Sequence, residues 1–231
     1  MKRLLSILSV SILAVFVTAG SAMAGPLPEP NLLYSGPYVD MYLKNLPSGL
    51  LEEKVYLDNV PGTTVIGHVG SQDGEPRVYF SSSETLTIVG SGWATIKAAD
   101  GYLNDLTITA PGYWFEDLIF SVNLFPNSVT DFSVTATDKS GGTDTFAGWT
   151  AAGTGWGAGE NRILLLSQTG DLMQSVTMYS LFGVDSVGGI DQIKQTEISG
   201  LTPVPEPSTM LLFGTSLVGL AAFGRKKLLQ K

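Results

Sequence analysis

The sequence predicts an all-β fold, an antiparallel β-sandwich of a jelly-roll-like kind, between an N-terminal signal helix and a single transmembrane helix at the C-terminus. Apolar and hydroxyl side chains alternate with a period of two, as in Phe132–Thr137, which is typical of strands with one buried face. Turn-forming pairs such as Asp73-Gly74 and Pro111-Gly112 recur about every ten residues, as they do in sandwiches. Helical periodicity is nearly absent from residues 25–200.

Residues 1–24 have the three parts of a secretory signal peptide. Lys2-Arg3 supplies positive charge, the run from Leu4 to Ala19 is apolar and uncharged, and Ala22-Met23-Ala24 places small residues where signal peptidase requires them. We therefore expect signal peptidase to cleave between Ala24 and Gly25. An uncleaved membrane anchor is the alternative, because the apolar run is slightly long for a signal.

Residues 25–201 form the predicted sandwich domain. In its last run, residues 190–198, Ile193 and Ile198 fall on opposite parity, which a β-bulge would reconcile. The clearer candidate strands are Tyr38–Leu43, Thr64–Val69, Arg77–Phe80, Thr85–Val89, Trp93–Ala98, Asp105–Thr109, Asp117–Asn123, Asp131–Thr137, Asn161–Ser167 and Gln174–Tyr179.

The composition of the domain limits its chemistry. The chain has no cysteine, so disulfides, thiol catalysis and thiolate metal sites are excluded. Residues 25–204 contain 7 basic and 20 acidic side chains, a net charge of −13. Such a domain repels phosphate backbones, so we expect no nucleic-acid partner. Divalent cations would be tolerated.

Two groups of residues in the domain could bind a ligand. Trp149 and Trp156 lie in a loop rich in Gly, Ala and Thr, where exposed aromatic faces could stack on sugars; the alternative is that they cap the core. Asp138 and Asp144 bracket a short acidic turn that could hold Ca²⁺, although solvated turn carboxylates are the simpler interpretation. No cofactor is predicted with certainty, and Ca²⁺ is possible.

Signals for enzymatic chemistry are weak. His68 is the single histidine, and no Gly-x-Ser-x-Gly nucleophile motif accompanies it. Gly153–Ala158 fits a dinucleotide fingerprint by spacing, but a strand rather than a helix is expected after it. Glu116 and Asp117 are adjacent, so on a strand they would point to opposite faces and could not flank one glycosidic bond. We therefore expect no enzymatic activity, with a secreted hydrolase as a remote alternative.

The C-terminus has three parts in fixed order. Residues 202–208 hold Pro203, Pro205 and Pro207, which predicts an exposed, semi-rigid spacer that cannot join a regular strand ladder. Residues 209–231 begin with an uncharged apolar run to Gly224, a short transmembrane helix of about 24 Å. A basic cluster then stops transfer and stays cytoplasmic; it consists of Arg225, Lys226 and Lys227.

This order, a Pro-Glu-Pro motif followed by a short apolar helix and a basic end, resembles the PEP-CTERM sorting signal of bacteria that make exopolysaccharide. The sorting motif itself is Val204, Pro205, Glu206 and Pro207. The resemblance implies recognition by the membrane enzyme exosortase, cleavage near this motif, and delivery to the outer surface or the extracellular matrix. Proteins with this signal often carry β-rich cargo, which agrees with the predicted fold.

Together these features predict an exported protein that its C-terminal helix holds in the membrane until it reaches the outer surface or the medium. Signal peptidase and exosortase are its expected processing partners. The expected function is that of a non-enzymatic surface or matrix protein associated with exopolysaccharide or biofilm. The alternative is a carbohydrate-binding module with a polysaccharide partner, with or without dependence on Ca²⁺.

Overall fold

The computed structural model describes most of the predicted domain and a short helical segment after it. The described residues are 31–43, 53–58, 60–70, 76–90, 93–124, 132–146, 159–168, 170–180, 190–205 and 211–218. The predicted signal segment, with Ala22, Ala24 and Gly25, lies outside them.

The domain is built from antiparallel strands, which confirms the predicted all-β class. The strands are β1 (Asn31–Ser35), β2 (Val39–Leu43), β3 (Glu53–Leu57), β4 (Gly62–Val69), β5 (Arg77–Ile88), β6 (Thr95–Ala98), β7 (Asp105–Thr109), β8 (Tyr113–Trp114), β9 (Asp117–Leu124), β10 (Phe132–Asp138), β11 (Thr143–Phe146), β12 (Gly159–Ser167), β13 (Met173–Ser180), β14 (Ile190–Ser199) and β15 (Thr202–Pro203). Turn residues separate them, as the sequence pattern predicts.

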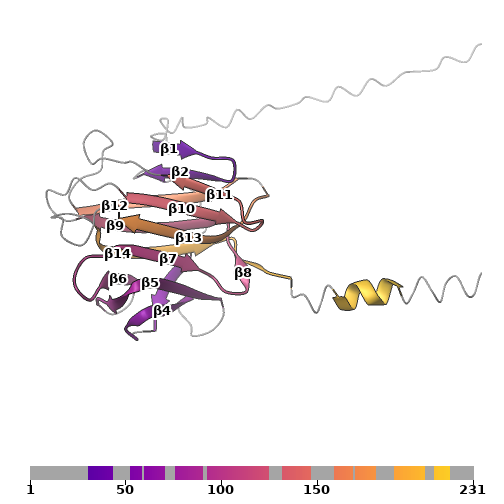
Figure 1. Ribbon diagram of the computed structural model, residues 1–231, viewed down its shortest axis with the longest axis horizontal. Coiled ribbons are helices and arrows are strands. Elements are labelled where there is room, and N and C mark those ends of the chain that lie inside the picture. The colour runs from indigo at the N-terminus through magenta and orange to yellow at the C-terminus, as the bar shows by residue number, and fades with distance from the viewer. Residues whose placement is uncertain are drawn as a thin grey trace, which may run out of the picture.

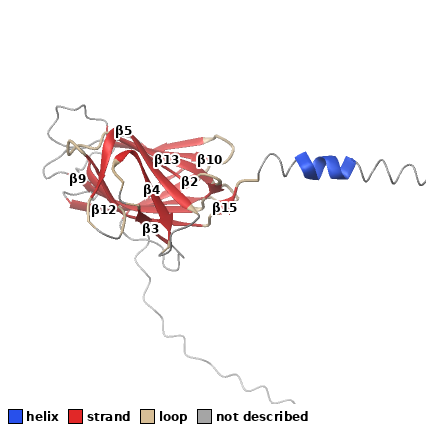
Figure 2. Cartoon of the chain, turned by 90° about the horizontal axis from the view of Figure 1, so that it is seen from below, coloured by secondary structure: helices blue, strands red, loops and turns tan. Residues whose placement is uncertain are grey.

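Thirteen strands belong to one continuous sheet, in the order β1-β2-β12-β9-β14-β3-β4-β5-β7-β13-β10-β11, with β6 pairing both β14 and β5. The sheet folds over, so that β13, β10 and β5 lie in one layer and β12, β9 and β3 in the other (Figure 1, Figure 2). The two layers of the predicted sandwich are therefore parts of one sheet. The layers stay connected because β5 is 12 residues long and pairs with β4, β7 and β6 along its length.

The core lies between the two layers and is formed by the inward side chains of alternate residues along the strands. β2 shows the alternation most simply, because Val39, Met41 and Leu43 are buried while the residues between them are partly exposed. The largest side chains in the core come from β5, β9, β11 and the segment after β8: Phe80, Phe120, Phe146 and Phe115. Burial of this apolar surface is the main force that holds the layers together.

A bulge in β14 lets Ile193 and Ile198 reach the same core, as the sequence analysis predicts. The pairing of β14 with β9 shifts register between Lys194 and Glu197. Gln195 lies in this break with a φ of 52°, the left-handed region that non-glycine residues rarely adopt. Ile193 and Ile198 are both almost fully buried, at 1% and 0% exposure. The extra residue therefore restores the inward direction that simple alternation would lose.

Asp144 joins the two ends of the sheet. It lies on β11 at one end, and its Oδ2 accepts hydrogen bonds from the backbone N–H groups of Tyr38 and Val39, near the start of β2 at the other end, both at 2.8 Å. The Tyr34 ring of β1 also packs edge-on against Phe146 of β11, with the ring centroids 4.4 Å apart. These contacts close the open side of the folded sheet.

A short helix follows the domain at residues 211–218 and projects away from it (Figure 1). Its large apolar side chains are exposed, with Leu211, Phe213 and Val218 at 69%, 67% and 71%. Among the described residues no helix is long and apolar enough to cross a membrane. The predicted transmembrane helix is therefore not confirmed, and the rest of its apolar run lies outside the described residues.

Candidate functional site: the C-terminal sorting segment

The C-terminal segment leaves the domain along β8 rather than directly into solvent. Strand β15 pairs with β8, so that Thr202 lies opposite Trp114 and Pro203 opposite Tyr113. One residue later, the Val204 N–H donates a hydrogen bond of 2.8 Å to the carbonyl oxygen of Gly112. The chain is thus held on the domain as far as residue 204.

Gly200 directs the chain from β14 into this pairing. Its φ is +63°, and a Cβ at this position would lie within 3.0 Å of side-chain carbons of Glu116. Any larger residue would both strain the backbone and collide with Glu116. The glycine therefore allows the sharp turn that brings Thr202 against β8.

The predicted spacer, residues 202–208, is partly folded onto the domain. Residues 202–205 are exposed, as expected, but Pro203 does take part in a short ladder, contrary to the prediction. Proline is tolerated there because β15 lies at the edge of its small sheet, where the ladder does not require an N–H donor from this residue. Glu206 and Pro207, and the basic residues Arg225, Lys226 and Lys227, lie outside the described residues.

Comparison with protein-family models identifies the segment that follows β15. Residues 203–227 match the model of the PEP-CTERM protein-sorting motif. The C-terminal segment is a PEP-CTERM sorting signal. This signal implies an exported protein that exosortase sorts to the cell envelope or surface. A comparison of the chain with curated proteins gives no significant match.

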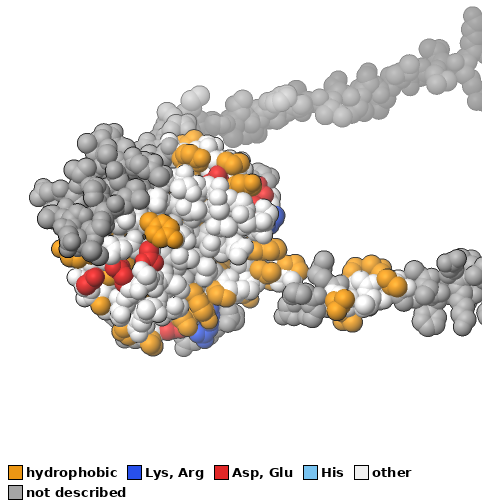
Figure 3. All heavy atoms as spheres, viewed as in Figure 1, with side chains coloured by type: hydrophobic (Ala, Val, Ile, Leu, Met, Phe, Trp, Pro, Cys, Tyr) orange, Lys and Arg blue, Asp and Glu red, His pale blue; other side chains and the backbone are white. Residues whose placement is uncertain are grey.

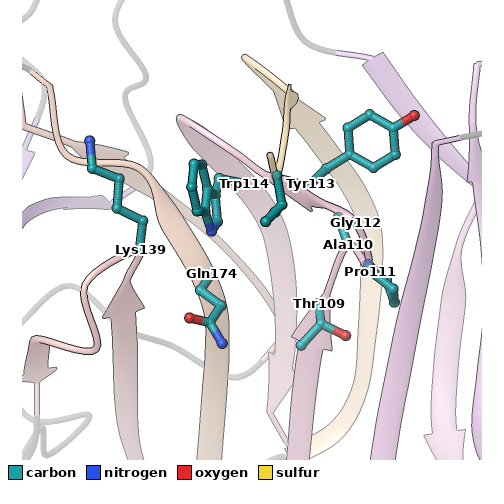
Figure 4. Close-up of a pocket in the computed structure, with 9 residues that line it drawn as sticks. Thr109, Ala110, Pro111, Gly112, Tyr113, Trp114, Lys139 and Gln174 are labelled. Atoms are coloured by element: carbon teal, nitrogen blue, oxygen red, sulfur yellow. The ribbon is translucent and has the colours of Figure 1, made fainter. Parts of the chain in front are cut away.

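The PEP-CTERM motif begins beside a hollow in the domain surface of about 360 Å³. The Trp114 indole lies next to Lys139 and above Gln174, while the Tyr113 ring points the other way (Figure 4). Thr109 and Val204 also line the hollow. An indole flanked by an amide, an ammonium group and a hydroxyl is an arrangement that could contact a sugar through both its C–H face and its hydroxyls.

This hollow is not the aromatic site that the sequence predicts. Trp149 and Trp156 lie outside the described residues, so their role in sugar stacking stays a prediction. The sequence favours Trp149 and Trp156 because their loop is rich in Gly, Ala and Thr, and no such context distinguishes Trp114. Only the pairing of β8 with β15 and the approach of Gln174 from β13 indicate the hollow.

The predicted Ca²⁺ ligands serve as hydrogen-bond acceptors for the backbone. Asp138 is almost fully buried at the end of β10 and accepts hydrogen bonds from the N–H groups of Ser140, at 3.0 Å, and Gly142, at 2.5 Å. Asp144 accepts those of Tyr38 and Val39. Within the described part of the chain, no group of three or more His, Asp or Glu side chains could hold a metal ion. Calcium binding stays a prediction, and a bound ion would compete with these donors.

His68 takes part in a charged cluster at the surface of β4. Its Nδ1 lies 3.0 Å from Oδ1 of Asp58, and Nη1 of Arg77 lies 3.3 Å from the other carboxylate oxygen. The imidazole also stacks on the Tyr56 ring, with the centroids 6.0 Å apart. These contacts hold the His68 side chain against Asp58 and Tyr56.

Glu116 and Asp117 occupy opposite faces, as predicted, because Glu116 is exposed and Asp117 is buried. Burial raises the pKa of the Asp117 carboxyl, a hydrogen bond of 2.7 Å from the Ser199 hydroxyl lowers it in part, and the negative charge of Glu116 raises it further. Asp117 joins the ends of β9 and β14 next to Gly200. It therefore stabilises the end of β14, from which the sorting segment continues.

Proposed function

We propose that this chain is a non-enzymatic cell-surface or matrix protein that its PEP-CTERM signal carries to the outer surface, where it associates with exopolysaccharide or biofilm. The observation that carries this proposal is the sorting motif at residues 203–227, which starts where the folded domain ends. Its first residues are exposed, so a processing enzyme could reach them. Signal peptidase would act at Ala24 and exosortase near Pro205.

The geometry also supports a temporary hold at the membrane. The chain from Val204 to Leu211 reaches at most about 25 Å when fully extended. If the apolar run that includes residues 211–218 enters the bilayer, the end of the domain that carries Gly112 stays close to the membrane surface until the chain is cut. Exposed apolar side chains on that helix favour a lipid or protein environment over water.

Mass spectrometry of the two ends of the protein tests this function. The full chain is expressed in a host with exosortase and in the same host without it. We expect a new N-terminus at Gly25 in both, and a new C-terminus near residues 205–207 only with exosortase. Lys231→Ala, which lies beyond the matched motif, is the control and should be processed normally. An unchanged C-terminus in both strains would contradict the proposal.

Carbohydrate binding is the second candidate function. It is favoured by the hollow around Trp114, which combines an aromatic ring with the polar side chains of Lys139 and Gln174 (Figure 4). This function is compatible with the proposed location outside the cell, because a matrix protein would meet polysaccharide there. The hydrolase alternative has no comparable observation in its favour.

A further inference from the structure

Hydroxyl side chains form two rows across the outer face of the layer that contains β13. The first row runs through paired positions on β4, β5, β7, β13, β10 and β11: Thr64, Ser81, Thr107, Thr177, Thr135 and Thr145. The second row is displaced by two residues along the strands: Tyr79, Thr109, Ser175, Thr137 and Thr143. Every side chain in the two rows carries a hydroxyl, and we name this surface the hydroxyl face.

The hydroxyl face is open to solvent and contains no charge. Its residues are exposed or partly exposed, whereas their neighbours along the strands, such as Val78, Ile108 and Val176, are buried. Figure 3 views the layer that contains β13 from outside, and white surface, neither charged nor apolar, covers much of its centre beside a small apolar patch, with acidic side chains toward the margins. In a domain with a net charge of −13 over residues 25–204, this neutral area is a local exception.

The hydroxyls are ordered before any ligand arrives. Three pairs in the first row bond to each other: Thr64 to Ser81 at 3.2 Å, Thr107 to Thr177 at 3.0 Å and Thr135 to Thr145 at 3.0 Å. Each such pair uses one donor and one acceptor, so it still offers one donor and several lone pairs outward. Threonine also has few χ1 choices. Binding would therefore immobilise little side-chain freedom.

The spacing of the hydroxyl face is regular. Neighbouring strands lie about 4.8 Å apart, and alternate residues on a strand about 6.8 Å apart. The second row leads into the hollow beside the sorting segment, because Thr109 belongs to both and Gln174 directly precedes Ser175. The Trp114 indole thus lies at one margin of an ordered array of hydroxyls.

We propose that the hydroxyl face, with the Trp114 hollow at its margin, binds a neutral polysaccharide. A sugar polymer presents hydroxyls at regular intervals, and each can exchange hydrogen bonds with groups that both donate and accept. An anionic polymer is disfavoured because the domain is acidic, the two rows contain no basic residue, and Lys139 is the single charged residue that lines the hollow. A second copy of the chain is disfavoured because burial of so many hydroxyls would remove their water with little apolar gain.

This inference rests on the proposed carbohydrate-binding function and is independent of whether exosortase processes the chain. Purified mature protein is incubated with insoluble cellulose, amylose or mannan, and with anionic alginate, and the bound fraction is measured. We expect retention on at least one neutral polysaccharide and weaker retention on alginate. Because the assay uses purified protein, its failure would leave exosortase processing unaffected, and failed processing would leave binding unaffected.

Two double variants test the surface itself. Thr135→Val with Thr177→Val removes two hydroxyls from the centre of the first row without changing side-chain shape or strand preference, and we expect retention to fall about tenfold. Thr143→Val with Thr145→Val removes one hydroxyl from each row at the edge strand β11, in case the central variant folds poorly. The matched control is Thr63→Val with Thr85→Val, two exposed threonines outside both rows, which should bind normally.

Several results would overturn the proposal. They are no retention on any neutral polysaccharide, stronger retention on alginate, or equal retention of the folded row variants and the control. Sedimentation provides a further check. A dimer of the native protein that Thr135→Val with Thr177→Val converts to monomer would assign the hydroxyl face to self-association instead.

Discussion

The N–H of Val204 donates a 2.8 Å hydrogen bond to the carbonyl oxygen of Gly112. This bond is the last one that holds the sorting segment on the domain among the described residues. It means that the folded domain, rather than the proline content alone, determines where the accessible part of the C-terminal segment begins. The start of the PEP-CTERM motif, where we propose that exosortase cleaves, therefore lies next to the hollow around Trp114.

Removal of this bond should expose more of the segment to proteases. Val204→Pro removes the donor, and we expect limited proteolysis to cut N-terminal to residue 205, where the native protein resists. The free energy of unfolding should fall by only about 1 kcal/mol, the net contribution of one such bond. Val204→Ala keeps the N–H and is the control. Equal cleavage in the three proteins would show that β15 does not protect the segment.

The turn at Gly200 should be intolerant of a side chain. Gly200→Ala must place a Cβ against Glu116 at positive φ, and we expect a loss of about 2 kcal/mol in the free energy of unfolding. Gly141→Ala is the matched control, because its φ is +89° and the space around it is open. It should lose only about 1 kcal/mol. Denaturant unfolding of both variants separates the steric effect from the backbone effect.

Asp144 should be a main contributor to closure of the folded sheet. Asp144→Ala leaves the N–H groups of Tyr38 and Val39 without their acceptor, and we expect a loss of about 2–4 kcal/mol in the free energy of unfolding. Asp144→Asn keeps one acceptor oxygen and should lose less. Thermal unfolding with and without added Ca²⁺ would also reveal a bound ion. Identical stability of the Ala and Asn variants would contradict the proposed role.

Asp117 should make stability depend on pH. Burial raises its pKa in the folded state above the unfolded value of 3.8, so the folded protein binds this proton more tightly. The contribution of Asp117 to the free energy of unfolding therefore increases as pH falls through the raised pKa, and the gain is complete below the unfolded pKa. Among the described residues its Oδ1 has no hydrogen-bond partner, consistent with a group that favours protonation.

Asp117→Asn is the test of this linkage. Relative to the variant, the native protein should be least stable near neutral pH and should gain as the pH is lowered toward about 4. Urea unfolding of both proteins at several pH values measures the difference. If the difference in the free energy of unfolding does not change with pH, the raised pKa is wrong.

The local sequence pattern was sufficient to predict many of the strands. The run Asp105–Thr109 was predicted with the bounds that the structure has, because its alternation is strict and turns flank it. The bulge in β14 was also predicted, since Ile193 and Ile198 could not otherwise share a face. Strands β1, β3 and β11 were missed although each pairs with a strand that neighbours it in the chain. They are only four or five residues long, and so few residues show alternation poorly.

The sequence by itself determined the PEP-CTERM motif and predicts the signal peptide, because processing enzymes read both signals as consecutive residues. It also determined the all-β class, because a period of two is a local property of the chain. Only the tertiary structure decided that β15 docks on β8, that Trp114 borders a hollow, and that hydroxyls from six strands form rows. These depend on register between segments as far apart as Thr107 and Thr177, and register is set by how the whole sheet folds around its core.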